Sequence, residues 1–269
     1  MKAALKMMIR LIPVVWSLQS QAQVYGGSVS AATGGTGRAA VVAGDSVFLN
    51  PATLPYLRGY YLYTMMGSKE MAVGLSDNTP ESPIPAALSY YRADLLQDFK
   101  LSLADFIIRK WTVGVSAHYY QVSQPEKPVI NINGDVGFAY APKPNYGFGV
   151  VFYNVVGESK NFPEVYKTYP RIGLGTNYIY HEFFRMRFDL LSAQNNDFSV
   201  PTVMLGLENY LSRWMLLRFG YRDENATEKE YGTVGFGFDL PRFKLNYAYE
   251  GDTKESANSR HSIDLAVPF

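Results

Sequence analysis

From about residue 58 to the end of the chain, apolar and polar residues alternate in short segments with no convincing helical period. In 184–190 the apolar set is Phe184, Met186, Phe188 and Leu190, and the alternating set is Arg185, Arg187 and Asp189. Side chains that alternate in this way lie on opposite faces of a β-strand. Because 217–222, 234–240 and 243–249 repeat the pattern, we expect strands with one apolar face throughout this part of the chain.

The alternating segments are 58–66, 69–76, 84–93, 99–109, 111–122, 131–141, 146–156, 169–180, 184–193, 201–211, 214–222, 231–239, 242–250 and 259–269. Most have the length of a tilted membrane strand, which needs about 9–11 residues to cross a bilayer. Their second face mixes Gly, Ala, Ser and Thr with charges, as a barrel lumen does. Apolar stripes on nearly every strand would aggregate in water. The pattern therefore predicts an all-β fold, a 14-stranded antiparallel transmembrane β-barrel over 58–269, rather than a soluble sandwich.

The connections between these segments alternate in length when followed back from the C-terminus. Short ones such as 240–241 and 212–213 separate longer polar ones such as 251–258 and 222–230. Outer-membrane barrels have short periplasmic turns and longer external loops, which indicates that both chain ends lie in the periplasm. One connection, 77–85, is long where a short turn is expected.

That exceptional connection contains Pro80, Pro83 and Pro85. Proline has no backbone N–H to donate to a β-ladder, so pairing at the start of the third strand should be broken or displaced. One interpretation is an ordinary irregular turn. The functional interpretation is a lateral gap in the barrel wall at these three prolines.

The first 22 residues have the pattern of a cleaved signal peptide. Lys2, Lys6 and Arg10 precede the apolar run 11–18, and small residues at 20 and 22 suit a cleavage site. The apolar run is too short for a membrane-spanning helix, which needs about 20 residues. We therefore divide the chain into a signal peptide (1–22), an N-terminal luminal plug segment (23–57) and the barrel (58–269).

The plug segment is the part of the mature chain that does not alternate. Small residues dominate it, and its distinctive positions are Gly37, Arg38, Asp45, Asn50, Pro51 and Ala52. Many positions on the expected luminal face are glycines, which leave space for it: Gly114, Gly137, Gly149, Gly173, Gly175, Gly206, Gly220, Gly235 and Gly237. Because buried charges are paired, we expect Arg38 and Asp45 to meet charges on the wall. The luminal charges predicted from strand parity are Arg185, Arg187, Asp189, Glu208, Arg218 and Asp264.

Composition narrows the function classes. Without the leader the chain has 22 basic and 24 acidic residues, a net charge of −2, which argues against a nucleic-acid binder. It has no cysteine, and its three histidines are too scattered for a metal cluster. His118 shares a face with Ser116, and His261 lies near Asp264, but this spacing defines no catalytic triad. We predict no catalytic residue, no metal site and no cofactor.

The chain ends in a strand whose last residue is Phe269. Alternating apolar residues with a terminal Phe resemble the signal that outer-membrane barrels present to the barrel assembly machinery. This ending, the leader and the strand pattern together predict the outer membrane of a Gram-negative bacterium, with outer-membrane lipid as a partner.

The stretch from Gly37-Arg38-Ala39 through Asp45-Ser46 to Asn50-Pro51-Ala52-Thr53-Leu54 resembles the N-terminal segment of the FadL-like and PorV-like outer-membrane barrels. The fragments 170–175, 206–210, 217–222 and 245–249 are similar to the same group. The resemblance covers nearly the whole mature chain and implies a 14-stranded barrel. This chain is much shorter than the fatty-acid transporters, so its external loops are too small for their extracellular ligand groove.

The resemblance implies a plugged, laterally gapped barrel that handles or docks a hydrophobic ligand or an exported partner. The alternative is a porin-like structural barrel that forms a homo-oligomer and encloses membrane lipid without solute transport. A more remote similarity to PopA-type porin-like proteins accompanies that alternative.

Overall fold

The computed structural model describes residues 26–125, 127–157, 161–254 and 259–269. The predicted signal peptide (1–22) and the first residues of the predicted plug segment lie outside the described residues. Among the residues that are described, no helix is long and apolar enough to span a membrane.

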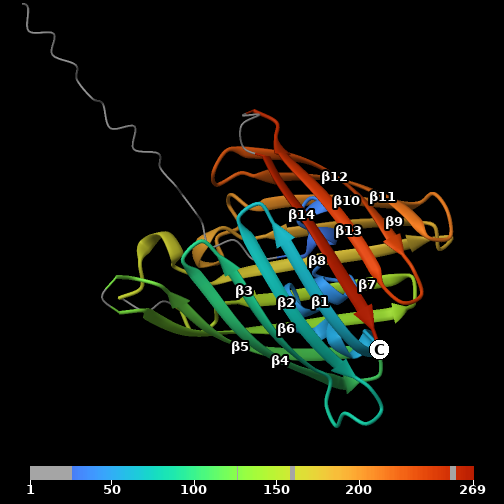
Figure 1. Ribbon diagram of the computed structural model, residues 1–269, viewed down its shortest axis with the longest axis horizontal. Coiled ribbons are helices and arrows are strands. Elements are labelled where there is room, and N and C mark those ends of the chain that lie inside the picture. Colours follow the sequence, from blue (N-terminus) through green and yellow to red (C-terminus); the bar gives the residue numbers. More distant parts are fainter. Residues whose placement is uncertain (1–25, 126, 158–160, 255–258) are drawn as a thin grey trace, which may run out of the picture.

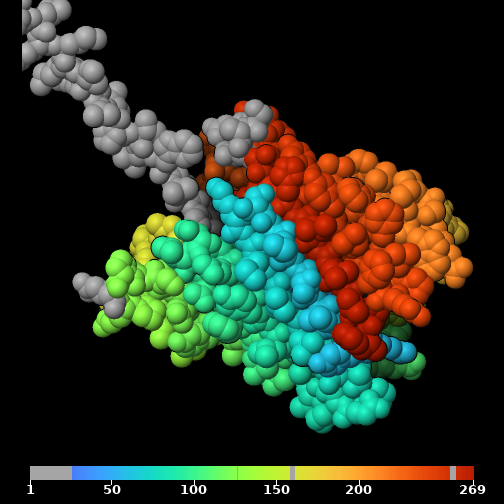
Figure 2. Space-filling view, in the orientation of Figure 1, coloured from blue at the N-terminus to red at the C-terminus, as the bar shows by residue number. Residues whose placement is uncertain are grey.

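The fold is a closed antiparallel barrel of 14 strands, as the alternating pattern predicted (Figure 1). The strands are β1 (Gly59–Gly67), β2 (Glu70–Asn78), β3 (Ala86–Ala93), β4 (Leu96–Ile108), β5 (Trp111–Val122), β6 (Val129–Lys143), β7 (Tyr146–Tyr153), β8 (Arg171–Tyr180), β9 (Phe184–Leu191), β10 (Thr202–Tyr210), β11 (Met215–Glu224), β12 (Lys229–Asp239), β13 (Lys244–Asp252) and β14 (Ser259–Pro268). Each strand pairs with its sequence neighbours, and β1 pairs with β14 from Tyr61–Pro268 to Gly67–Ser262. Closure pairs the first strand with the last, and Figure 2 shows the cyan β1 directly against the red β14.

The two ends of the barrel differ. The end where β1 begins and β14 finishes, marked C in Figure 1, is called the turn end; its connections are 79–85, 109–110, 144–145, 181–183, 211–214 and 240–243. The opposite end is called the loop end; its connections are 68–69, 94–95, 123–128, 154–170, 192–201, 225–228 and 253–258, with short 3₁₀ helices η2 (Glu164–Tyr166) and η3 (Gln194–Asn196). The longest connections lie at the loop end.

Several strand boundaries differ from those expected, for local reasons. β3 begins at Ala86 instead of residue 84, directly after Pro85. β7 ends at Tyr153 because Asn154 adopts a left-handed conformation (φ 55°). The predicted long connection 222–230 is only 225–228, since β11 and β12 pair up to Glu224–Lys229. The alternation of connection lengths is therefore weaker than the sequence indicated.

The wall separates apolar from polar side chains as strand parity predicted. Outward residues such as Phe188, Phe219 and Phe236 are exposed, with 51% of Phe219 accessible. Their inward neighbours, such as Arg187 and Arg218, are buried. An exterior of this kind suits hydrocarbon, and a polar interior is usual for a membrane barrel. The outside of the barrel is thus a lipid-facing surface.

Residues 26–57, called the luminal segment from here on, lie inside the barrel, where Figure 1 shows them in blue between the strands. The segment contains the short helices α1 (Ser28–Ala32) and α2 (Ala43–Phe48) and the 3₁₀ helix η1 (Pro51–Tyr56). Most of its residues are buried. Its helices are too short to be stable alone, so contacts with the wall hold its conformation.

Candidate functional site

The luminal segment approaches the wall at its glycines. A Cβ built on Gly114 would lie 2.5 Å from Ala52 N, and one built on Gly206 would lie 2.6 Å from Thr33 Cβ. Gly137, Gly149, Gly173, Gly175, Gly220 and Gly235 face the segment in the same way. Gly237 is the exception among the nine predicted positions, since its neighbours are Asn246, Arg218 and Leu216. Eight of the nine glycines therefore leave room for the luminal segment.

Gly114→Ala is expected to destabilise the barrel by about 1–3 kcal/mol, because the new methyl group would overlap the backbone at Pro51 and Ala52. The measurement is the urea midpoint of unfolding in lipid vesicles. Gly232→Ala is the matched control, since its nearest contact would be Thr253 Cγ2 at 3.9 Å. Equal midpoints for the two variants would show that the segment does not press on the wall at Gly114.

The Asn50-Pro51-Ala52 turn begins η1 and connects it to an earlier part of the luminal segment, at Arg38. The Asn50 side chain accepts a hydrogen bond from Ala52 N (3.0 Å) and donates one to Arg38 O (2.7 Å). Pro51 occupies the first helical position, where its missing N–H costs nothing. Asn50 therefore caps η1 and holds the chain at Arg38 twelve residues earlier.

Arg38 forms a buried ion pair with Asp189 on β9. Its Nη1 lies 3.0 Å from Asp189 Oδ2, and the same oxygen accepts the backbone N–H groups of Gly37 (3.0 Å) and Arg38 (2.9 Å). Strand parity placed Asp189 in the lumen, and Arg38 meets this carboxylate rather than Glu208 or Asp264. Glu208 is instead surrounded by arginines of the wall, and Asp264 is occupied by hydrogen bonds.

Asp45 on α2 pairs with Arg187 (3.2 Å), which is one of the partners expected for it. Next to this pair, Glu208 contacts Arg185 (2.8 Å) and Arg218 (2.5 Å). Arg187 is 4.0 Å from Glu208 as well. All five side chains point into the lumen, and three arginines share two carboxylates. The network joins α2 to β9, β10 and β11.

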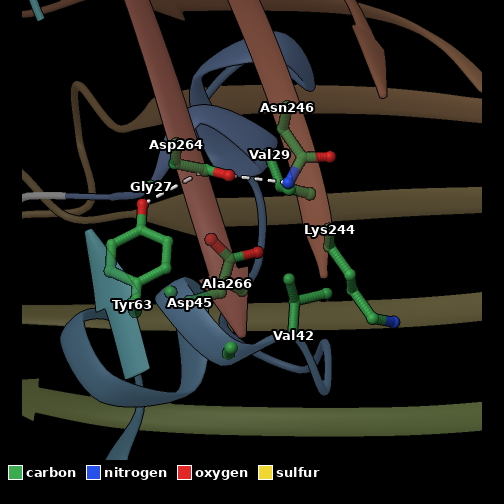
Figure 3. A pocket seen from close by; sticks show the side chains of 11 residues that line it. Gly27, Val29, Val42, Asp45, Tyr63, Lys244, Asn246, Asp264 and Ala266 are labelled. Carbon is green, nitrogen blue, oxygen red and sulfur yellow. Dashed lines mark hydrogen bonds between the residues drawn. The ribbon is translucent and has the colours of Figure 1, made fainter. Parts of the chain in front are cut away.

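Asp264 on β14 binds the start of α1. It accepts hydrogen bonds from Ser28 N (2.9 Å), Tyr63 Oη (3.2 Å) and Asn246 Nδ2 (2.6 Å). A cavity of about 20 Å³ lies here. Figure 3 shows Asp264, Tyr63 and Asp45 around it and Lys244 directed away. Since one water needs roughly 10–15 Å³ of such space, the cavity fits a water but no organic ligand.

Sequence reasoning missed a buried charge cluster on β4, β5 and β6. His118 Nδ1 lies 3.0 Å from Asp98 Oδ2, and its Nε2 lies 2.8 Å from Asp135 Oδ2. Lys100 Nζ lies 3.5 Å from Asp135 and donates to Phe48 O of α2 (3.0 Å). The alternation on these strands could have assigned the four side chains to the luminal face. The expected fourth strand began at residue 99, however, and so left Asp98 in a loop, whereas β4 begins at Leu96.

The two pairs considered from the sequence, His118 with Ser116 and His261 with Asp264, are not in contact. His261 faces outward and contacts Tyr247 Oη through Nδ1 (2.6 Å), while Asp264 faces the lumen. His118 has Asp98 and Asp135 as partners rather than Ser116, which contacts Ser102 (2.8 Å). Among the described residues, no group of three or more His, Cys, Asp or Glu side chains could hold a metal ion.

An apolar cluster lies where the luminal segment contacts the wall from β1 to β4. Its buried members are Ala43, Val47, Phe48, Leu54 and Leu57 of the luminal segment and Tyr63, Met65, Ala72, Ala87, Ala104 and Ala266 of the wall. This cluster, called the apolar sector, reaches β14 through Ala266 and contrasts with the charged wall from β9 to β11. One side of the lumen is therefore lined by apolar side chains.

Pro80, Pro83 and Pro85 lie in the connection next to the apolar sector, visible as a teal bulge at the turn end in Figure 2. The β3–β4 pairing ends near Ala86–Leu103, with one further hydrogen bond from Ala104 N to Pro85 O (3.0 Å). β4 continues to Ile108 and pairs there with β5 alone among the described strands. The wall is thus one strand short beside 105–108, although β3 pairs continuously from Ala86 to Ala93.

A second apolar cluster lies at the loop end. Phe162 of the 154–170 connection is buried against Leu96, Tyr120 and Val122, which face the lumen from β4 and β5. Tyr166 of the same connection donates a hydrogen bond to Asp94 (2.7 Å) across the mouth of the barrel. The part of the connection from Phe162 to Tyr166 therefore folds over the lumen.

Comparison with known proteins shows no matching family model and no matching curated protein. Solved structures do match. The Ralstonia pickettii toluene transporter TbuX has a TM-score of 0.68 at 13% identity, covering 92% of this chain and 99% of that chain. The monoaromatic hydrocarbon channel CymD has a TM-score of 0.66 at 15% identity, covering 91% and 98%. A Pseudomonas aeruginosa FadL homologue has a TM-score of 0.59 at 8% identity, covering 91% and 98%.

At these identities the similarity establishes architecture and leaves the ligand open. It extends over the barrel and agrees with the resemblance drawn from the Gly37–Leu54 stretch and the strand fragments. This chain therefore has the fold of the FadL-like barrels, the fold of the toluene transporter TbuX and the hydrocarbon channel CymD.

Proposed function

We propose that the protein is an outer-membrane barrel that passes small hydrophobic molecules, with the luminal segment acting as a plug. The observation that carries this proposal is the apolar sector: one side of a lumen that also holds buried ion pairs is lined by apolar side chains. TbuX and CymD, which share the fold, are described as a toluene transporter and a monoaromatic hydrocarbon channel.

The proposed route runs along the inner face of β4. It begins at Leu96, in the cluster under Phe162, and reaches Ala104 in the apolar sector. Between them lie Asp98 and Lys100, so a hydrophobic molecule would have to pass a buried charged step. The proposed exit is the lateral gap at Pro80, Pro83 and Pro85, beside the overhang of β4.

The proposed orientation places the turn end in the periplasm. Both chain ends of the barrel domain lie there: Phe269 N donates to Tyr60 O (2.9 Å) at the start of β1. This is the parity expected for a barrel with an even number of strands whose longest connections face outward. Phe269 is then available to the barrel assembly machinery from the periplasmic side.

Pro83→Thr/Pro85→Val is expected to slow hydrophobic uptake several-fold. The replacements restore two N–H donors, so β3 can extend alongside 105–108 and close the proposed gap. The measurement is the entry rate of the fluorescent probe 1-N-phenylnaphthylamine into proteoliposomes that contain the full chain.

Pro241→Ala, in the exposed β12–β13 turn, is the matched control and should leave uptake unchanged. If empty liposomes and wild-type proteoliposomes take up the probe equally, the proposal that the protein transports small hydrophobic molecules is wrong. If the wild type transports the probe and the double variant keeps its rate, the exit does not lie at the prolines.

A further inference from the structure

Basic residues recur at the turn end beside outward-facing aromatic residues. Four connections there repeat the arrangement, in the pairs Lys110–Trp111, Lys143–Tyr146, Arg213–Trp214 and Arg242–Phe243. In each pair the basic residue lies in or next to the turn, and the aromatic residue lies at or next to the start of the following strand. We call Arg109, Lys110, Lys143, Arg213 and Arg242 the basic collar.

The aromatic members lie on the lipid-facing surface. Trp111, Tyr146, Trp214 and Phe243 are all exposed. Trp111 stacks on Tyr140 with ring centroids 4.4 Å apart, so its ring lies along the outside of β5 and β6. Aromatic rings at the ends of membrane strands lie at the level of the lipid headgroups. They therefore place the basic collar at headgroup depth or just beyond it.

The charges of the collar are available for a ligand. None of the ion pairs found between described residues includes Arg109, Lys143, Arg213 or Arg242. All four side chains are exposed. The Arg213 guanidinium lies over the Trp214 ring, 4.7 Å from its centroid, which directs this charge along the outer surface.

Acidic residues at the same end do not neutralise the collar. Asp239 is paired with Lys244 (2.9 Å). Glu81 and Glu182 lie in the β2–β3 and β8–β9 connections, which are outside the collar, and no ion pair found between described residues joins Asp105 to a collar side chain. Two arcs of positive charge remain, one from β4 to β7 and the other from β10 to β13.

We propose that the basic collar binds the phosphate headgroups of anionic phospholipids in the leaflet at the turn end. Guanidinium and ammonium groups are the usual partners of phosphate oxygens, and basic residues next to a membrane attract anionic lipid. The aromatic residues fix the depth at which these groups meet the headgroups. This inference rests on the proposed membrane location but not on the proposed transport of hydrophobic molecules.

The test is native mass spectrometry of the full chain after equilibration with equal amounts of dimyristoyl phosphatidylglycerol and dimyristoyl phosphatidylcholine. The wild type should retain phosphatidylglycerol preferentially. Each removed charge should lower that preference by about fivefold. The variant Lys143→Gln/Arg213→Gln/Arg242→Gln should therefore lower the preference by roughly a hundredfold, while Arg109 and Lys110 keep a smaller part of it.

The matched control removes three exposed charges from the loop end in Lys69→Gln/Lys127→Gln/Lys254→Gln and should keep the wild-type preference. A charge-conserving variant, Lys143→Arg/Arg213→Lys/Arg242→Lys, should keep it too, which guards against a folding defect. No preference in the wild type, or equal loss in both glutamine triples, would overturn the proposal. The two glutamine triple variants should take up the fluorescent probe at the same rate. The uptake assay therefore tests the proposed transport independently of lipid binding.

Discussion

Deletion of residues 31–52 is expected to raise the single-channel conductance of the barrel by about tenfold or more, since wide barrels without a plug hold an aqueous channel. In the full chain α1, α2 and η1 lie in the lumen, and the cavity beside Asp45 and Asp264 fits a single water. Removing the segment exposes a lumen lined by glycines and charges, which water can fill. The measurement is conductance in planar lipid bilayers.

The wall should survive this deletion, because its backbone hydrogen bonds run between neighbouring strands and close through β1 and β14. The charges that lose partners, Arg187 and Asp189, would become hydrated rather than remain buried without compensation. Heat-modifiable migration in gel electrophoresis serves as the control for a folded barrel. Unchanged conductance in a folded deletion variant would rule out the plug model.

The alternation of apolar and polar residues was sufficient to predict most of the fold. Once Phe188 and Arg187 are assigned to opposite faces, the side of every neighbouring residue follows, because the period of a strand is two. The same logic explains why the nine glycines were recognised as luminal: each shares a face with small or charged residues on its strand. Periodicity reports the face of a residue and its strand, and these are the features that the structure confirmed.

Periodicity does not give the register between strands or the residues that face each other across the lumen. Contacts that depend on these were therefore not predicted. Arg38 could have met any luminal carboxylate; its pairing with Asp189 depends on the path of the luminal segment, which has no period. The cluster of His118 with Asp98 and Asp135 needs the registers His118–Lys100 and Ser116–Asp135 between three strands. Such registers are set by the closure of the whole barrel and not by any one segment.

The apolar sector was missed for a different reason. Its members Ala72, Ala87 and Ala104 are small and sit on the face that parity marks as luminal. From the sequence alone they look like small residues that leave space in the lumen, as the glycines do. Only the packing of Phe48, Leu54 and Leu57 against them shows that this side of the lumen is apolar rather than empty. The observation that carries the proposed function is therefore a tertiary one.

Asp189→Ala is expected to lower the free energy of unfolding by about 3–5 kcal/mol, the usual cost of leaving one member of a buried ion pair alone. Asp189 Oδ2 accepts Arg38 Nη1 and the N–H groups of Gly37 and Arg38. Its loss leaves a guanidinium that is 2% exposed without this carboxylate. The measurement is urea unfolding in vesicles, followed by fluorescence of the tryptophans in the wall.

Two variants decide whether this cost comes from the buried charge. Arg38→Met/Asp189→Ala should recover a large part of the lost stability, because an uncharged pair of similar volume has no desolvation penalty. Asp239→Ala breaks the more exposed pair with Lys244 and should cost about 1 kcal/mol or less. If the double variant is no more stable than Asp189→Ala, the loss comes from the backbone hydrogen bonds at Gly37 and Arg38. The luminal segment would then be held by its turn geometry, and Arg38 would serve as a filler of the space left by Gly173 and Gly175.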